Sequence, residues 1–199
     1  MDCSLARFAD IVRERSMLNR CTMESPAILY VRETRSVVSL AMLQELVERS
    51  NKLPPPGTMR LCLHPDKDAL LQEMYIVHQA GSYLRPHRHT DKDESCLVVL
   101  GKMAVFFFTD QGEVQDVAVY GNPGSPFPFH ARIPRNHWHC QFVLAPQVLF
   151  LEMTTGPFVR EAMEFAPFSP APQSSGIREY MAWLAAKIPV AASGDIRAE

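Results

Sequence analysis

Residues 81–101 read GSYLRPHRHTDKDESCLVVLG, and this stretch decides the fold of the chain. His87 and His89 are one residue apart, so on an extended strand they share a face at a separation of roughly 7 Å. Two imidazoles placed in this way can converge on one ion. Glu94 opens a second apolar strand and can bring a carboxylate in from the opposite side. A fourth ligand must come from elsewhere, and the best candidate lies near residue 139. The stretch predicts a metal site inside a small β-barrel.

The rest of the central sequence has the pattern of a β protein. Short apolar runs follow one another from Met59 onward, and Gly, Pro, Asn and Asp residues separate them. Many short strands at regular spacing are typical of a sandwich or a barrel. The predicted strands are 60–64, 70–78, 83–87, 95–100, 103–109, 114–120, 129–133, 138–144 and 147–153.

The two ends of the chain have helical patterns instead. Apolar residues recur at helical spacing in 4–16, in 39–49 and in 177–188. A short apolar run at 28–31 predicts an edge strand, and three consecutive prolines at 54–56 cannot continue a helix. We therefore expect an N-terminal appendage at 1–57, a barrel at 58–158, and a linker, terminal helix and loose tail at 159–199.

Bulk composition excludes several classes of function. The chain of 199 residues is 47% hydrophobic and has a formal net charge of −2, so it has no general attraction for nucleic acid or anionic membranes. No apolar run approaches the roughly 20 residues that span a bilayer, and the first residues lack the pattern of a secretory signal. Five cysteines without a C-x-x-C pair indicate reduced thiols rather than a disulfide framework. We expect a cytoplasmic protein.

The spacing of the histidine stretch resembles a known motif. Gly81, five residues, His87, one residue, His89, four residues, Glu94, six residues and Gly101 match the first motif of the cupin superfamily. The resemblance implies a mainly β fold, the cupin jelly-roll barrel (a double-stranded β-helix), with flanking N-terminal helices and a C-terminal helix.

The second cupin motif is looser in this chain. The segment Pro134 to His139 resembles its core, with Asn136 in place of a glycine and Val143 in place of a final asparagine. Asn is the usual substitute where a turn needs a positive φ. By this resemblance the metal ligands are His87, His89, Glu94 and His139. Three nitrogens and one carboxylate suit one divalent metal ion, such as Zn, Fe, Mn, Ni or Cu.

Neighbouring residues compete for some of these roles. Asp91 and Asp93 are rivals of Glu94, but a charged turn is usually just solvated, and the motif spacing favours Glu94. His137 has the same strand parity as His139, and we expect it to line the mouth of the barrel.

Four residues are candidates for catalysis. Tyr83 and Arg85 share the parity of the histidine pair, and an arginine inside a barrel needs an anionic partner. Tyr83, Arg85, Lys92 and His137 are therefore candidates for proton transfer or for binding an anion. His64 and His78 could reach the cavity, but a hydrogen-bonded structural role is the simpler interpretation.

Over about residues 40–158 the chain resembles the WbuC-type cupin-fold metalloproteins, which occur in bacterial surface-polysaccharide gene clusters. The resemblance rests on the segment 81–89, on the acidic turn 91–94 and on Leu63-His64-Pro65. It implies a cytoplasmic metal-binding protein, commonly a homodimer, in polysaccharide (O-antigen) or sugar-nucleotide metabolism. The chemical step is not implied.

Several functions remain open at this point. The first is an enzyme that acts on a small sugar, sugar nucleotide or anionic molecule by isomerisation or metal-assisted proton transfer, in which the metal polarises an oxygen. An iron-dependent dioxygenase uses the same ligands. The alternatives are a non-catalytic binding module with a structural metal and a metal-free sugar-binding cupin.

Overall fold

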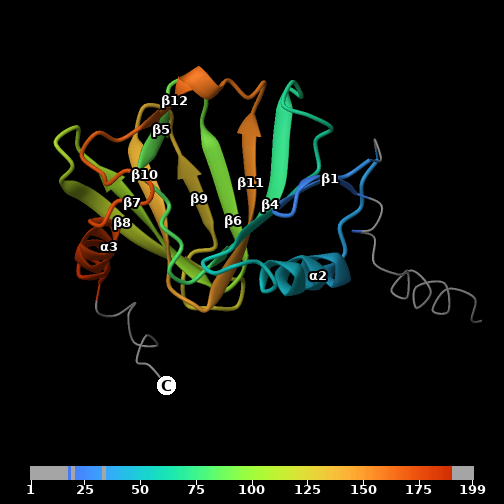
Figure 1. The fold of residues 1–199 in the computed structure, drawn as a ribbon, viewed down its shortest axis with the longest axis horizontal. Coiled ribbons are helices and arrows are strands. Elements are labelled where there is room, and N and C mark those ends of the chain that lie inside the picture. The colour runs from blue at the N-terminus through green and yellow to red at the C-terminus, as the bar shows by residue number, and fades with distance from the viewer. Residues whose placement is uncertain (1–17, 19–20, 33–34, 190–199) are drawn as a thin grey trace, which may run out of the picture.

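A computed structural model describes residues 18, 21–32 and 35–189, which form two β-sheets facing each other, with helices on the outside (Figure 1). The seven-stranded sheet has the order β1-β2-β3-β4-β11-β6-β9, and the five-stranded sheet has the order β12-β5-β10-β7-β8. The elements in chain order are β1 (Thr22–Ser25), β2 (Ile28–Tyr30), α2 (Leu40–Ser50), β3 (Thr58–Cys62), β4 (Leu71–Gln79), β5 (His87–His89), β6 (Glu94–Leu100), β7 (Lys102–Phe108), β8 (Val114–Gly121), β9 (His130–Ile133), β10 (Trp138–Val143), β11 (Gln147–Thr155), the 3₁₀-helix η2 (Arg160–Ala162), β12 (Met163–Phe165) and α3 (Ile177–Ala185). This is the mainly β jelly-roll barrel that the motifs predict.

Alternating side chains of the two sheets fill the space between them. Strand side chains point to opposite faces in turn, so every second residue of β6, β7 and β11 turns inward. The interior cluster includes Cys96, Val98, Val105 and Phe150, which are fully buried. At the first residue of β6, the interior face changes from these apolar side chains to the carboxylate of Glu94. The polar end of the barrel is where the site lies.

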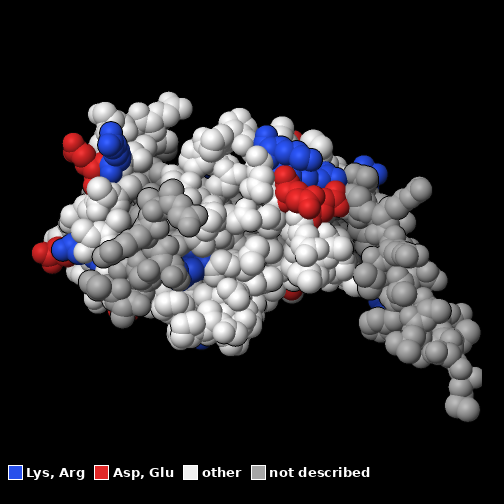
Figure 2. All heavy atoms as spheres, turned by 90° about the horizontal axis from the view of Figure 1, so that it is seen from below, with Lys and Arg blue, Asp and Glu red and all other residues white. Residues whose placement is uncertain are grey.

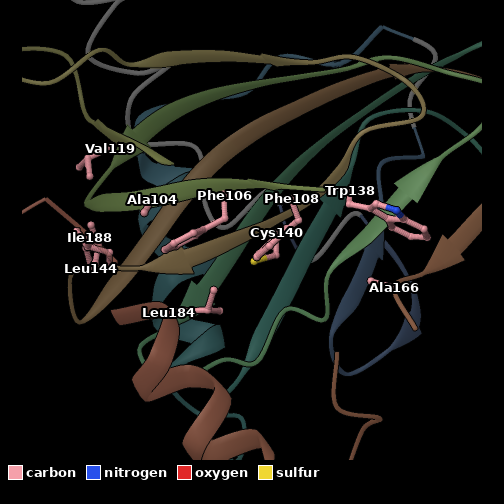
Figure 3. Close-up of a cluster of buried hydrophobic side chains, with 10 residues drawn as sticks. All are labelled: Ala104, Phe106, Phe108, Val119, Trp138, Cys140, Leu144, Ala166, Leu184 and Ile188. Atoms are coloured by element: carbon pink, nitrogen blue, oxygen red, sulfur yellow. The ribbon is translucent and has the colours of Figure 1, made fainter. Parts of the chain in front are cut away.

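Helix α3 and the segment before it cover the outer face of the five-stranded sheet (Figure 3). Phe106 and Cys140 of this sheet are fully buried against Leu184 of α3, and Ala166 of the preceding segment is also buried. The segment 163–170 thus packs on the barrel rather than acting as a free linker. On the other side, α2 covers the outer face of the seven-stranded sheet, and Leu46 is its most deeply buried residue.

Two positions with positive φ shape turns of the barrel, one beside the site and one at the other end of β6. Asn136 has a φ of 62°, as predicted for the residue that replaces glycine in the second motif. Its backbone N–H donates to the carbonyl oxygen of His89 at 2.7 Å, so the turn before β10 is tied to β5. Gly101, in the turn between β6 and β7, has a φ of 82°.

One predicted strand is placed wrongly, and two strands are not predicted. The strand expected at 83–87 is instead β5, which begins only at His87, because Pro86 has no N–H for a ladder and the residues before it bind the C-terminal segment. The strands β1 and β12 have no clear alternating pattern in the sequence. The predicted strand at 28–31 is confirmed as β2, although β1 takes the edge position.

The N-terminal helix predicted at 4–16 and the loose tail after residue 190 lie outside the described residues. The predicted helices at 39–49 and 177–188 are confirmed as α2 and α3. The strands β1 and β2 extend the seven-stranded sheet by parallel pairing of β2 with β3, so residues 22–30 join the sheet. The proposed division at residues 57 and 158 stays a prediction.

The described residues contain no membrane-spanning helix, and the face seen from below has no basic patch. In the described ranges, each helix is too short or too polar to cross a bilayer. On the face shown in Figure 2, acidic and basic side chains lie side by side, and the described residues form no continuous basic patch there.

Candidate metal centre

Three strands bring the predicted ligands together at the polar end of the barrel. The central strand β10 carries His139, which lies directly opposite His87 of β5 in the antiparallel register. Glu94 begins β6 in the facing sheet. The rings of His87 and His139 are 4.4 Å apart between centroids, and those of His87 and His89 are 5.4 Å apart. The sheet pairing therefore places residues from distant parts of the sequence around one point.

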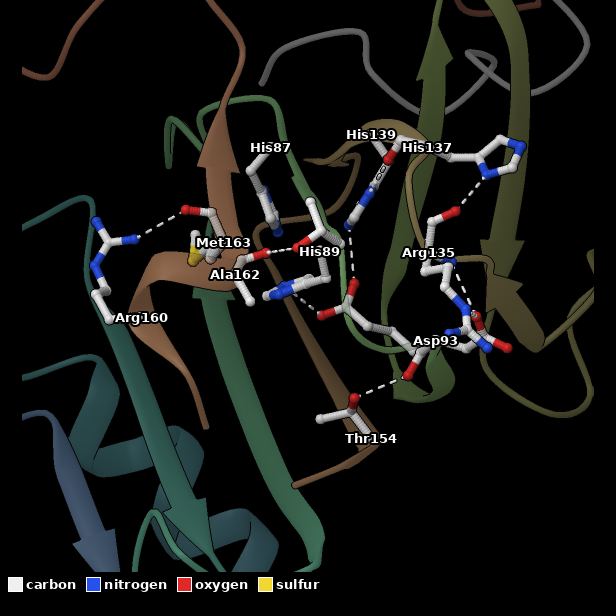
Figure 4. A network of polar contacts seen from close by, with 12 residues as sticks. His87, His89, Asp93, Arg135, His137, His139, Thr154, Arg160, Ala162 and Met163 are labelled. Carbon is white, nitrogen blue, oxygen red and sulfur yellow. Dashed lines mark hydrogen bonds and ion pairs between the residues drawn. The ribbon is translucent and has the colours of Figure 1, made fainter. Parts of the chain in front are cut away.

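His87, Glu94 and His139 form a group that could hold one metal ion, since their ligand atoms lie within 4.8 Å of one another. Two ligands on opposite sides of one ion are about 4 to 4.4 Å apart, because each metal–ligand bond is about 2.0–2.2 Å long. Nε2 of His139 lies 2.9 Å from Oε2 of Glu94, and neither of these buried atoms has another hydrogen-bond partner among the described residues (Figure 4). Buried polar atoms are normally paired. This nitrogen and oxygen have only each other, and an ion between them would take the place of that contact.

Backbone carbonyls orient the two imidazoles of this group. Nδ1 of His87 lies 3.0 Å from the carbonyl oxygen of Arg85, and Nδ1 of His139 lies 2.9 Å from that of His137. A carbonyl can only accept, so Nδ1 carries the proton and donates it in both rings. When the ring is neutral, Nε2 is then left with its lone pair directed at the centre. This is the usual way in which proteins prepare histidine ligands for a metal.

His89 occupies a different position from the other two histidines. Its Nε2 lies 3.0 Å from the second carboxylate oxygen of Glu94, and its buried Nδ1 has no hydrogen-bond partner among the described residues. It is thus beside the group of three but not within it. The role of His89 as a fourth ligand stays a prediction.

The electrostatics of the centre favour neutral imidazole at His87 and ionised carboxylate at Glu94. Burial and the charge of His139 lower the pKa of His87 to about 3. Burial alone would raise the pKa of Glu94, but His139 and His89 outweigh it and hold that pKa well below the usual value. Burial opposes protonation of His139 also, yet Glu94 raises the pKa of His139. A metal needs a neutral imidazole and an ionised carboxylate, so its binding would release the proton that His139 holds for Glu94.

The structure separates the predicted ligands from their rivals. Asp93 lies outside the barrel, where it accepts a hydrogen bond of 2.6 Å from Arg132 and one of 2.9 Å from the backbone N–H of Arg135. These bonds lower its pKa. His137 is exposed, and its ring lies 6.3 Å from that of Phe107. Neither residue is placed to share an ion with Glu94.

Tyr83 and Arg85 contact the C-terminal segment rather than the centre. The hydroxyl of Tyr83 donates to the carbonyl oxygen of Pro170 at 2.8 Å. Arg85 donates to Oγ of Ser169 at 3.1 Å and to the carbonyl oxygen of Ala166 at 3.3 Å. Because 83–86 is not a strand, the parity that would turn these side chains inward does not hold. Their catalytic role stays a prediction.

His64 and His78 are hydrogen-bonded within the sheet, as the simpler interpretation predicts. Nδ1 of His64 accepts from the backbone N–H of Glu73 at 3.0 Å. Nδ1 of His78 lies 2.9 Å from Oγ1 of Thr58, and burial lowers the pKa of His78 to about 3.

One acidic residue near the centre, Glu152, was not predicted from the sequence. Glu152 of β11 is paired in register with Cys96 of β6, two residues from Glu94, and has the inward parity of Phe150. Burial and the charge of Glu94 raise its pKa to about 7. Inward parity relative to Phe150 is the signal that could have found it, since a carboxylate on the core face of a strand is unusual.

Comparison with known sequences gives one family match. Residues 38–120 match a family model described as "Domain of unknown function (DUF6016)". The matched range contains His87, His89 and Glu94, but it ends before His139. No curated protein matches the sequence.

Solved structures share parts of the chain at low identity. A protein from Shewanella oneidensis matches at 14% identity over 55% of this chain and 74% of its own, with a TM-score of 0.46. KdgF from Halomonas sp. matches at 18% identity over 55% and 88%, with a TM-score of 0.42. Oxalate decarboxylase from Bacillus subtilis, which is described as having Mn(II) centres, matches at 15% identity over 49% of this chain, with a TM-score of 0.40. The chain covers 24% of that enzyme and 21% of procruciferin, an 11S globulin from Brassica napus.

Proposed function

We propose that the protein binds one divalent metal ion and uses it to act on a small polar molecule. The observation that carries this proposal is the convergence of His87, Glu94 and His139, in which the buried Nε2 of His139 and Oε2 of Glu94 have no partner among the described residues except each other. A structural histidine pair would normally satisfy those atoms within the protein. The set of two or three imidazoles and one carboxylate suits Zn, Fe, Mn or Ni.

Within this function, the residues at the metal centre have defined roles. His87, Glu94 and His139 would hold the ion, with His89 as the fourth ligand. A bound divalent ion acts as a Lewis acid that polarises a carbonyl or hydroxyl oxygen. Three or four protein ligands leave open positions if the ion is five- or six-coordinate. Lys92 and His137 remain candidates for anion binding and for proton transfer at the mouth.

The proposed reaction class is isomerisation or proton transfer on a sugar or sugar nucleotide. This reaction class is supported by the resemblance of residues 40–158 to WbuC-type cupins. The same resemblance leads us to propose that the protein is cytoplasmic and homodimeric. Sugars with a carbonyl next to a C–H bond are the expected substrates, because polarising the carbonyl oxygen makes that hydrogen more acidic.

Metal analysis of protein purified without a histidine tag tests the first step. We expect one divalent ion per chain, and we expect His139→Ala to weaken metal binding by more than about tenfold. His137→Ala is the matched control, because His137 is two residues away but exposed, and it should keep the ion. Absence of stoichiometric metal, or equal metal content in the two variants, would show that this group is not the metal centre.

Incubation of the metal-loaded protein in D₂O tests the second step. Proton NMR should show metal-dependent deuterium incorporation into a sugar or nucleotide sugar, which His139→Ala abolishes. If metal is bound but a broad panel of such sugars shows no exchange, the sugar substrate class is wrong while the metal centre stands.

A further inference from the structure

The interior beside the metal centre contains a buried cation without an anionic partner. Lys92 is only 5% exposed and makes no hydrogen bond or ion pair with any residue in the described ranges. Its ammonium lies 5.0 Å from the centre of the Phe158 ring. A cation over an aromatic face recovers only part of the cost of leaving water. A buried ammonium in this state is suited to an anion that comes from outside.

Glu152 is a second group without a partner in the same interior. Its carboxylate makes no hydrogen bond or ion pair with the described residues, although the side chain keeps some accessible surface. Glu152 is one row below Glu94 on the neighbouring strand, and diagonal neighbours of this kind are about 7–8 Å apart. The positive charges of Arg60 and Lys92 both act on its pKa. The three charged side chains therefore lie close enough to influence one another.

Arg60 lies at the open edge of this space. On β3 it has the opposite parity to Met59 and Leu61, which pack against α2, so Arg60 points to the inner side of the sheet. It is exposed and, like Lys92, has no ion pair within the part of the chain that the structure describes. The region thus contains two cations that form no ion pair with the described residues.

We propose that the space bounded by the metal centre, Lys92 and Glu152 binds a small oxyanion, a carboxylate or phosphate group of the ligand, with Lys92 as its anchor. This inference rests on the proposed function, because a divalent ion adds further positive charge that Glu94 offsets only in part. Arg60 attracts the anion at the edge, while the carboxylate of Glu152 opposes its binding. An uncharged sugar would leave Lys92 unpaired, so the preferred ligand is an acidic or phosphorylated molecule.

Titration calorimetry with two probes tests the proposal on the metal-loaded protein. Malonate represents a carboxylate ligand and inorganic phosphate represents a phosphate ligand, and at least one of them should bind. Lys92→Met keeps the length and apolar part of the side chain but removes the charge. We expect it to weaken binding by about ten- to a hundredfold, as for the loss of one charge-assisted hydrogen bond.

The matched control is Lys187→Met, since Lys187 is exposed beyond the end of α3, on the outer side of the barrel, and should leave affinity unchanged. Glu152→Gln removes negative charge beside the anion, so it should tighten binding several-fold at pH 8. The proposal is overturned if neither probe binds or if both lysine variants bind alike. It is also overturned if Glu152→Gln leaves affinity unchanged.

Metal content measured in every variant keeps the two proposals distinct. A wild-type protein that binds no metal would refute the proposed function. The oxyanion site would still be tested, because calorimetry on the metal-free protein compares the two lysine variants in the same way. Metal retained with no anion bound would refute only the oxyanion site.

Discussion

Replacement of Gly101 by alanine tests how the turn between β6 and β7 fits the barrel. Gly101 has a φ of 82°, a region that costs an L-residue with a side chain about 1–2 kcal/mol. A Cβ built on it would lie 2.2 Å from the carbonyl oxygen of Gln147 and 3.2 Å from Cα of Val148. Both obstacles are backbone atoms of β11, so neither can rotate away.

The expected loss for Gly101→Ala is the sum of two effects. The conformational cost is about 1–2 kcal/mol, and moving packed backbone typically adds about 1–3 kcal/mol. The gain from a less flexible unfolded chain returns about 0.4–1 kcal/mol. A net loss of about 2–4 kcal/mol follows, which corresponds to a fall in Tm of several degrees in a chain of this size.

Urea unfolding measures this loss, and Gly124→Ala isolates its cause. Gly124 has a similar φ of 93°, but a Cβ there would meet nothing within 4 Å, so only the conformational cost applies. We expect Gly124→Ala to lose about 1 kcal/mol or less. Equal losses in the two variants would refute the reasoning, because the clash with β11 would then contribute nothing.

Further predictions concern the C-terminal segment and the response to acid. Arg85→Met removes two hydrogen bonds to the segment 166–169 and should lower the free energy of unfolding by about 2 kcal/mol, against about 1 kcal/mol for Tyr83→Phe. If either variant keeps its stability in urea but loses turnover, the catalytic role predicted for that residue is supported instead. Because the pKa of His78 falls from 6.5 to about 3 on folding, the unfolded chain takes up a proton first as the pH falls. The stability that His78 contributes is therefore complete above about pH 6.5 and is lost toward pH 3, at about 1.4 kcal/mol per pH unit for one proton. His78→Gln should flatten the slope of stability against pH between 4 and 6, and an unchanged slope would contradict this assignment.

The strands and the choice among nearby histidines follow from local rules that a sequence displays. The runs of apolar residues gave β6, β7 and β10 to within a residue or two, because each strand contributes side chains to the core. Asn136 has its predicted positive φ, since few residues other than glycine and asparagine adopt it. The inward position of His139 and the exposed position of His137 are in line with the motif spacing.

The sequence-based predictions fail where segments that are distant in the sequence contact each other. Parity suggested that Arg85 faces the barrel, but Ser169 and Ala166 hold its guanidinium outside the site. These partners are more than 80 residues away along the chain, so no local pattern could indicate them. The short strand β12 exists for the same reason, because it pairs with β5 and has little tendency to form alone.

The sequence by itself determined that this chain forms a barrel and that two histidines and an acid lie at one end of it. Strand alternation and motif spacing are properties of neighbouring residues, and they are enough for that conclusion. Only the tertiary structure decided which donors converge, because the pairing of β10 with β5 sets His139 against His87, and the facing sheet supplies Glu94. The same packing leaves His89 beside the group and places Lys92 and Glu152 without partners next to it. These relations depend on contacts across the barrel, which sequence spacing does not encode.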